Sequence, residues 1–351
     1  MARLHPLLGF SYTALRSNLS ELSSPYKLNF AVTLKCQSRC LTCNIWQLKP
    51  KGELSIEEIR ELASKNKSFR WLALTGGEPF LRSDIVEIVH AFEETSNLYM
   101  LTLPTNSLCS SSIVIPKLKE MLERGVPHTV ITVSIDGSEE LHDAIRGIKG
   151  NYRKAISLFD LMHNMQDEYK NLSVVFGYTM SKFNQGRFME TFESVKNELP
   201  YVTYSDFHIN IAQNSGNYYR NASEYIAVER SAAELELSNI ISMRKNRGIT
   251  DAIEGAFIKG MLYFVRNGKP PLRCRSLEAS IFMDSFGDIY PSIMWDMKIG
   301  NVRETGYYIR PILLSEAAAH AKEMIHYGKD PLHWTSCEAY QALIGHLPSL
   351  L

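Results

Sequence analysis

The sequence predicts an α/β fold built on a parallel sheet, with the chain forming one large domain or a large domain and a small one. From Tyr26 to about residue 225, strand-like and helix-like segments alternate in about six repeats of roughly 30 residues each. Polar and glycine-rich stretches follow the predicted strands, at the edge that carries function in both barrels and open doubly wound sheets. The 351 residues are ample to bury a core without disulfide bonds.

Each predicted element rests on a local signal. Ser55 and Glu58 form a capping box that opens a helix, and the apolar run before Gly76-Gly77 is a short strand stopped by a turn. Gly125 is placed to end a helix, and residues 129–135 alternate as a strand does. The predicted strands cover residues 28–34, 70–75, 98–103, 129–135, 172–180 and 202–211, and the predicted helices cover 56–66, 83–94, 117–124, 152–166 and 187–198.

The two ends of the chain differ from the alternating core. Residues 1–25 form an N-terminal extension, which we expect to be a helix packed on the outside of the core; an amphipathic segment on a lipid surface is the alternative. The core is assigned to residues 26–225 and a charge-rich helical connector to 226–268. Pro270-Pro271 then breaks the chain, and within residues 269–351 the segments 280–284 and 289–291 predict a β-hairpin.

The charge balance, the apolar runs and the cysteine content together restrict the classes of protein to which the chain can belong. Lys and Arg together number 38, as do Asp and Glu, so there is no net field to attract nucleic acid or an anionic membrane. No apolar run approaches the length of a membrane span. Six cysteines are too few for a disulfide scaffold in a chain of this length, and their clustering favours metal ligation in a reducing compartment. We therefore expect a cytoplasmic protein that binds no nucleic acid.

Three of the six cysteines crowd one loop after the first predicted strand, at Cys36, Cys40 and Cys43. Three thiolates at this spacing can hold three irons of a four-iron cluster. The fourth iron then has no local protein ligand, and such an open position is typical of a catalytic rather than a structural metal site. A zinc knuckle or chance clustering is the alternative at this point.

The cysteine triplet, followed by Gly76-Gly77-Glu78-Pro79 after the next strand, resembles the radical S-adenosylmethionine (radical SAM) superfamily. The resemblance covers most of residues 26–225, and the combination of the two motifs makes the zinc alternative weak. One departure is Thr42, where many members carry an aromatic residue. The resemblance implies a partial (β/α)6 TIM-like barrel that binds SAM and a [4Fe–4S] cluster.

The resemblance also implies roles for single residues. Gly76 and Gly77 would let backbone carbonyls approach the SAM amino group, Glu78 would offer that ammonium a carboxylate, and Pro79 would stiffen the turn. Arg146 would grip the SAM carboxylate with its guanidinium, the alternative being a solvated loop arginine. The remaining predicted cofactor contacts are Thr105, Asn106, Ser134, Asp136 and Asn184, with a plain turn as the alternative for Thr105-Asn106.

The C-terminal region resembles a SPASM/twitch extension in a degenerate form. Its matching residues are Cys274, the run 287–292 and Cys337, and such a module normally binds auxiliary iron–sulfur clusters. Ser292 stands where Cys is usual, and the segment from His333 to Cys337 lacks a further Cys that relatives often place there. An auxiliary cluster on Cys274 and Cys337 is therefore doubtful. The alternatives are a cluster-free α+β cap, or cysteines that donate hydrogen atoms; Cys109 is expected to be an ordinary loop thiol.

By resemblance, the function is reductive cleavage of SAM to a 5′-deoxyadenosyl radical, which abstracts hydrogen from a small-molecule or peptide substrate. The outcome would be epimerisation, oxidation or bond formation. An N-terminal leader-binding domain does not fit into the first 25 residues, which weakens peptide maturation with a fused recognition module. The expected partner is a reductant such as flavodoxin or ferredoxin. The alternative function is a non-catalytic iron–sulfur protein that binds SAM or a partner.

Overall fold

The computed structural model describes residues 6–20, 22–245 and 248–346. Within them the strands form one sheet in the order β6-β5-β4-β3-β2-β1-β7-β8-β9. Strands β1 to β6 pair in parallel with their neighbours, so the predicted parallel sheet is confirmed. These strands are β1 (Lys27–Thr33), β2 (Trp71–Gly76), β3 (Met100–Thr105), β4 (His128–Ser134), β5 (Leu172–Met180) and β6 (Phe207–Ile211).

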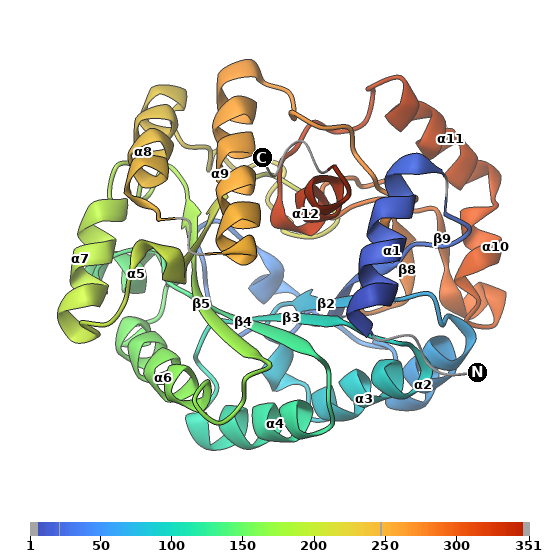
Figure 1. Ribbon diagram of the computed structural model, residues 1–351, viewed down its shortest axis with the longest axis horizontal. Coiled ribbons are helices and arrows are strands. Elements are labelled where there is room, and N and C mark those ends of the chain that lie inside the picture. The colour runs from blue at the N-terminus through green and yellow to red at the C-terminus, as the bar shows by residue number, and fades with distance from the viewer. Residues whose placement is uncertain (1–5, 21, 246–247, 347–351) are drawn as a thin grey trace.

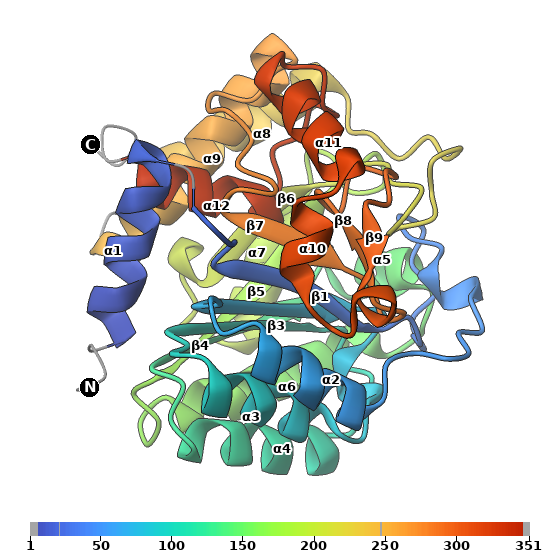
Figure 2. The same cartoon turned by 90° about the vertical axis from the view of Figure 1, so that its right-hand side faces the viewer.

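Helices connect successive parallel strands and cover the outer face of the sheet (Figure 1). They are α2 (Ile56–Lys65), α3 (Ile85–Thr95), α4 (Ser111–Glu123), α5 (Glu139–Arg146), α6 (Asn151–Met165) and α7 (Phe188–Glu198). Figure 2 shows α2, α3, α4 and α6 as one layer beneath the strands. Side chains alternate across β4, where Ile131 and Val133 are buried towards the helices and Thr132 and Ser134 are partly exposed on the other face.

Most sequence-based boundaries agree with the structure to within two residues, but the starts of one helix and one strand do not, and one helix was not predicted at all. Helix α4 begins at Ser111, six residues before the prediction, because Ser110 accepts the N–H of Ser112 and the helix contains Pro116 without ending there. Helix α5 was not predicted. Strand β6 begins at Phe207 rather than residue 202, because a 3₁₀ turn over Tyr204–Asp206 precedes it.

Helix α1 (Pro6–Leu19) confirms the helix expected in the N-terminal extension, whose residues 1–5 and 21 lie outside the described part. Its Phe10 and Ala14 pack against Tyr26, Trp71 and Ala279 at the amino-terminal edge of the sheet. Helix α12 (Ser336–Gly345) lies beside α1 and α9, and Figure 1 shows it almost end-on between them. Helices α1 and α12 therefore cover the end of the sheet at which the parallel strands begin.

The C-terminal part of the chain continues the same sheet. After α8 (Arg230–Met243) and α9 (Ile249–Asn267), β7 (Ser280–Met283) pairs in parallel with β1, and β8 (Asp288–Tyr290) and β9 (Gly300–Asn301) follow antiparallel. The predicted hairpin is confirmed by the β7–β8 pair. Residues beyond 268 thus share a sheet and a core with the N-terminal part. Helices α10 (Ile309–Leu313) and α11 (Glu316–His326) precede α12.

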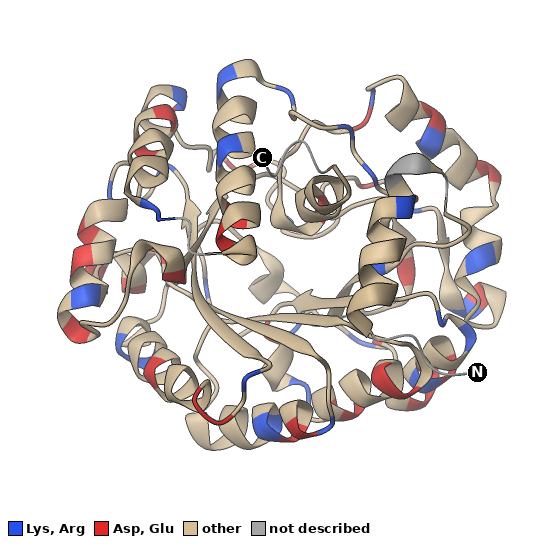
Figure 3. Ribbon diagram, in the orientation of Figure 1, with Lys and Arg blue, Asp and Glu red and all other residues tan. Residues whose placement is uncertain are grey.

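Charged side chains lie mainly on the helices and loops, with both signs interspersed, while the central strands carry few of them (Figure 3). Among the described residues, no helix combines the length and the apolar character needed to cross a membrane.

Candidate functional site

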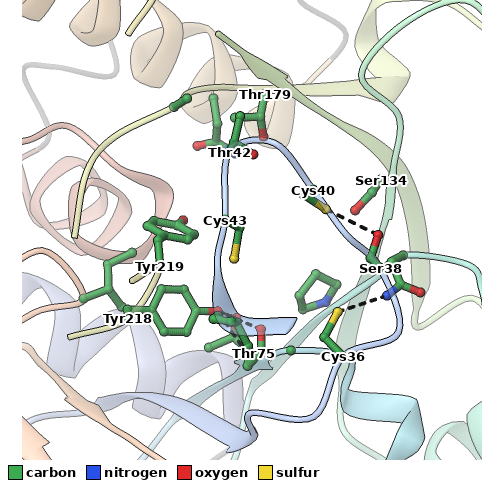
Figure 4. Close-up of a pocket in the computed structure, with 18 of the residues that line it drawn as sticks. Cys36, Ser38, Cys40, Thr42, Cys43, Thr75, Ser134, Thr179, Tyr218 and Tyr219 are labelled. Atoms are coloured by element: carbon green, nitrogen blue, oxygen red, sulfur yellow. Dashed lines mark hydrogen bonds between the residues drawn. The ribbon is translucent and has the colours of Figure 1, made fainter. Parts of the chain in front are cut away.

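A cavity of about 240 Å³ opens at the carboxyl ends of the parallel strands. Three of its lining residues are Cys36, Cys40 and Cys43, from the loop that follows β1. All three are free thiols, and Figure 4 shows their sulfurs pointing into the same space. Three convergent thiols on one short loop have the donor chemistry of an iron–sulfur site and form no disulfide.

The cysteine loop is held on both flanks by backbone hydrogen bonds. The N–H groups of Arg39 and Leu41 donate to the carbonyls of Arg146 and Ile145 at the end of α5, both at 2.9 Å. On the other flank, the N–H of Asn44 donates to the Tyr219 carbonyl at 2.8 Å. The three thiols are therefore carried on a loop whose course is fixed by main-chain contacts rather than by the side chains themselves.

Gly76 and Gly77 bring the end of β2 against this loop. A Cβ on Gly76 would lie 2.1 Å from the Thr33 carbonyl oxygen, and the φ of Gly76 is +127°. A Cβ on Gly77 would lie 2.2 Å from the Lys35 carbonyl oxygen and 2.9 Å from the Cys36 Cβ. Both glycines line the cavity. Their lack of a side chain is required here by the neighbouring backbone, a reason that the sequence did not reveal.

Glu78 lies behind the cavity wall and is fully buried. Its carboxylate accepts the N–H of Asn106 at 2.7 Å, the N–H of Phe80 at 3.1 Å and the hydroxyl of Thr105 at 3.2 Å. Burial raises its pKa to about 7, and these donors oppose the rise. Glu78 thus ties the end of β2 to the end of β3, and neither it nor Pro79 is among the residues that line the cavity. Its predicted contact with SAM stays a prediction.

Arg146 and Asp136 form an ion pair on the cavity wall, with Arg146 Nε 2.7 Å from Asp136 Oδ2. The guanidinium also donates to Cys40 Sγ at 3.7 Å, and Asp136 Oδ1 accepts the Thr179 N–H at 3.0 Å. Burial alone would lower the pKa of Arg146, but Asp136 and Cys40 outweigh it and raise the pKa. The guanidinium predicted to grip the SAM carboxylate therefore already has a carboxylate partner inside the protein.

The other predicted contacts divide into two groups. Thr105, Asn106 and Ser134 line the cavity, and the Asn106 amide donates to Cys36 Sγ at 3.6 Å. Asn184 is fully buried and is not among the lining residues. Its amide donates to the carbonyls of Asp136 at 2.9 Å and Thr179 at 3.0 Å, so it holds together the ends of β4 and β5.

Several lining residues were not found from the sequence. The hydroxyl of Tyr218 contacts Thr75 Oγ1 at 2.5 Å and accepts the Gly76 N–H at 3.1 Å, so it braces the glycine turn. Tyr219 lies beside it (Figure 4). Both tyrosines come shortly after β6. Functional residues commonly follow the carboxyl ends of parallel strands, and this rule could have pointed to them. The start of α12 contributes Thr335 and Ser336, which no local pattern indicated, together with Cys337, which had been predicted only as a doubtful auxiliary ligand.

The surroundings of the three thiols can be compared with what an iron–sulfur cluster requires of its ligands. Burial raises the pKa of Cys36 to about 11 and that of Cys43 to about 12, so both are neutral thiols near pH 7. Metal binding requires thiolates and therefore releases their protons. N–H groups of Asn106 and Arg146 point at the sulfurs of Cys36 and Cys40, and such donors stabilise thiolate charge. The residues present therefore fit a cluster held by three cysteines.

The remaining cysteines lie elsewhere. Cys337 lines the main cavity, whereas Cys274 lines a separate small cavity, so the two predicted auxiliary ligands face different spaces. Ser292 is buried, and its hydroxyl accepts the Met294 N–H at 3.2 Å. Cys109 accepts a hydrogen bond from Gln37 at 3.4 Å and is not among the residues lining either cavity.

Residues 30–195 match the model of the Radical SAM superfamily. Among curated relatives, the chain is 29% identical to an AdoMet-dependent heme synthase of Methanosarcina barkeri over 54% of this chain and 52% of the relative. It is 26% identical to an Fe-coproporphyrin III synthase of the same organism, over 64% of this chain and 53% of the relative. The chain thus spans about half the length of these relatives.

The fold is shared with solved structures. Streptococcus suis SuiB bound to S-adenosylmethionine superimposes with a TM-score of 0.60 at 15% identity, over 86% of this chain and 68% of SuiB. A second solved structure, native anSMEcpe with bound AdoMet, gives 0.59 at 15% identity, over 84% and 83% of the two chains. The family match implies SAM and a [4Fe–4S] cluster as cofactors. The stretch that matches the Radical SAM superfamily model, residues 30–195, carries the three cavity cysteines and the glycine turn.

Proposed function

We propose that this chain is a radical SAM enzyme that reductively cleaves SAM and abstracts hydrogen from a small-molecule or peptide substrate. The observation that carries the proposal is the convergence of Cys36, Cys40 and Cys43 on one cavity with the Gly76-Gly77 turn on its wall. When bound, the [4Fe–4S] cluster and SAM supply a 5′-deoxyadenosyl radical. In this proposal the curved sheet is a partial (β/α)6 barrel, and residues 269–351 are a twitch-type cap.

The chain's own residues would orient and shield the cofactors. The two flanking sets of main-chain hydrogen bonds hold the cysteine loop. The Arg146 guanidinium donates a hydrogen bond to Cys40 Sγ, and the Asn106 amide donates one to Cys36 Sγ, so each of these two sulfurs has a donor beside it. Tyr218 fixes the glycine turn, and α12 blocks the opposite end of the sheet and limits the entry of water.

Arg146 and Glu78 would act differently from each other. In the proposal, Arg146 shares its guanidinium between Asp136 and the SAM carboxylate, since both it and Asp136 line the cavity. Glu78 acts as a positioning residue, because its three donors already occupy both carboxylate oxygens. Thr105, Asn106 and Ser134 are the other candidates for contacts with SAM, and Asn184 supports the strand ends behind them.

The names of the relatives and one peptide-bound structure bear on the substrate class. The two Methanosarcina barkeri relatives are named as an AdoMet-dependent heme synthase and an Fe-coproporphyrin III synthase, and a further relative as a GTP 3′,8-cyclase, and each of these names refers to a small molecule. A precursor peptide is bound in one structure of SuiB, which has the same fold. Both classes therefore stay within the proposal, together with a one-electron reductant such as flavodoxin or ferredoxin.

The test is an anaerobic assay of the reconstituted protein with dithionite and SAM, reading out 5′-deoxyadenosine. Product is expected from the unaltered protein and from Cys109→Ala, whose thiol is not among the cavity-lining residues. Cys43→Ala is expected to give none. If the unaltered protein makes no more product than Cys43→Ala, the proposal fails and the non-catalytic SAM-binding alternative is favoured.

Counting the irons bound per chain in the same sample tests whether residues 269–351 hold an auxiliary cluster. About four irons per chain would mean one cluster, and about eight would mean an auxiliary cluster as well. Because Cys274 and Cys337 face different cavities, we expect about four. A cap without a cluster has no redox centre to accept an electron from the substrate, and this favours a redox-neutral outcome such as epimerisation or addition.

A further inference from the structure

Outside the main cavity, Cys274, Asp330 and His333 come together from two loops. One ligand atom from each lies within 4.8 Å of the others. Cys274 follows α9, while Asp330 and His333 belong to the loop between α11 and α12. We propose that these three residues bind one divalent transition-metal ion of the zinc type, distinct from the iron–sulfur site.

The donor set fits such an ion. Zinc accepts thiolate, imidazole and carboxylate ligands together, with bonds of about 2.3 Å to sulfur, about 2.0–2.1 Å to nitrogen and about 2.0–2.2 Å to oxygen. Tetrahedral ligands at these lengths lie roughly 3.3–3.8 Å apart. The three atoms would therefore move together by only about 1 Å on binding. A four-iron cluster is less suited, since it is held by cysteine thiolates and Cys274 is the only cysteine of the group.

His333 provides a second, independent observation. Its side chain is buried, with 7% of its surface exposed. Its Nδ1 has no hydrogen-bond partner among the residues that the structure describes. Buried polar atoms normally have a partner, so an unsatisfied imidazole nitrogen beside a thiol and a carboxylate calls for one. A metal ion in this position would satisfy it.

The site also has room for a single ion. Cys274, Asp330 and His333 line a cavity of about 20 Å³, close to the volume needed for one water molecule. An ion there would leave a fourth position for water or another ligand. A divalent ion would be balanced by the Asp330 carboxylate and by the Cys274 thiolate, whose proton is released on binding. The neutral imidazole adds no charge.

The loop that carries Asp330 and His333 is anchored next to the site. The Trp334 indole N–H donates to the Phe257 carbonyl at 2.9 Å, and the ring lies where a Cβ on Gly260 would be 2.5 Å away. Directly after this anchor, Thr335, Ser336 and Cys337 enter the main cavity. A metal that joins Cys274 to His333 would therefore fix the start of α12 and the part of the cavity wall that α12 forms.

The experiment uses the full chain with Cys36, Cys40 and Cys43 all changed to alanine, so that zinc cannot bind those thiols. Zn²⁺ titration is expected to give one ion per chain, and Co²⁺ a thiolate charge-transfer band with tetrahedral d–d bands. His333→Ala, Cys274→Ser and Asp330→Asn in this background are expected to weaken binding by roughly 10- to 100-fold or more. His320→Ala, an exposed histidine on α11, is the matched control.

Circular dichroism of each variant separates lost binding from lost folding, and Asp330→Asn is the mildest change. Zn²⁺ should also raise the melting temperature of the three-alanine protein and leave that of its His333→Ala form unchanged. Equal zinc affinity with and without His333 would overturn the proposal. The iron content of the protein with intact cavity cysteines gives a second way to overturn the proposal. If that protein binds about eight irons, and the second set of four requires Cys274 but not His333, the site holds an auxiliary cluster instead. Neither result depends on SAM cleavage.

Discussion

Replacing Glu78 by Gln tests how the end of β2 is joined to the end of β3. The glutamate carboxylate receives three donors, two on Oε2 and one on Oε1, and is fully buried. Glutamine keeps the shape but replaces one oxygen by an NH₂ group, which must then face an N–H donor of Asn106 or Phe80. One buried hydrogen bond is lost and two donors oppose each other, at a cost of about 1–3 kcal/mol.

The pH dependence of this cost gives a sharper signature. Glu78 has a pKa of about 7 in the folded protein against 4.5 ordinarily. Between these values the folded state holds a proton that the unfolded state has lost, so stability falls as the pH rises through this range and is level above it. The whole difference is worth about 3 kcal/mol, of which about 2 kcal/mol falls between about pH 5.5 and about pH 8. Glutamine has no such dependence.

The measurement is urea unfolding at these two pH values for the protein with and without Glu78→Gln, in the three-alanine background. At the lower pH, where Glu78 is a neutral acid in the folded protein, the variant should be less stable by about 1–3 kcal/mol, because the hydroxyl oxygen of the acid can still accept an N–H and the glutamine NH₂ cannot. At the higher pH the difference in stability should shift by about 2 kcal/mol in favour of the variant. Taking the difference cancels the pH dependence of other buried groups, such as Asp284. Glu94→Gln, an exposed position on α3, is the control. A gap that is the same at both pH values would refute the raised pKa, and no gap at either would refute the structural role.

Two further predictions concern the cavity wall. Arg146→Ala leaves the carboxylate of Asp136, of which 4% of the side chain is exposed, without its cation, and should cost about 3–5 kcal/mol in urea unfolding. Arg153→Ala, which breaks ion pairs of a half-exposed arginine with Glu139 and Glu198, should cost far less stability; equal losses would contradict a special role for the buried pair. Gly76→Ala should destabilise the protein more than Gly125→Ala and should reduce 5′-deoxyadenosine formation. Both glycines have positive φ, but only at Gly76 would a Cβ lie against the backbone, 2.1 Å from Thr33 O. Similar urea midpoints for the two glycine variants would show that backbone conformation alone matters there.

Much of the site could be predicted from the sequence because its signals are local. Three cysteines on one short loop, and two glycines after the next strand, are patterns within a few residues, and the structure brings both to one cavity. The strand and helix alternation is likewise local, and β5 agrees with its prediction over Leu172–Met180. Helix α5 was missed, although its end supplies the carbonyls of Ile145 and Arg146 that hold the cysteine loop.

The partners of the charged side chains could not be predicted, because they depend on long-range packing. Arg146 was predicted to bind the carboxylate of SAM, yet in the fold its Nε lies 2.7 Å from Oδ2 of Asp136. Glu78 was predicted to contact a ligand, yet Thr105 and Asn106 at the end of β3, together with the N–H of Phe80, donate three hydrogen bonds to it. In both cases burial makes an internal partner worth far more than it would be in water, so the folded chain supplies one.

The sequence by itself determined the βα alternation, the three-cysteine loop and the glycine turn, since each depends on residues close together along the chain. Only the tertiary structure decided which residues share a cavity: the tyrosines after β6, the first turn of α12, and the separate group of Cys274, Asp330 and His333. Cys274 and His333 are far apart in sequence, and the packing of the α11–α12 loop against the middle of α9, where Trp334 contacts Phe257 and Gly260, brings the loop to Cys274.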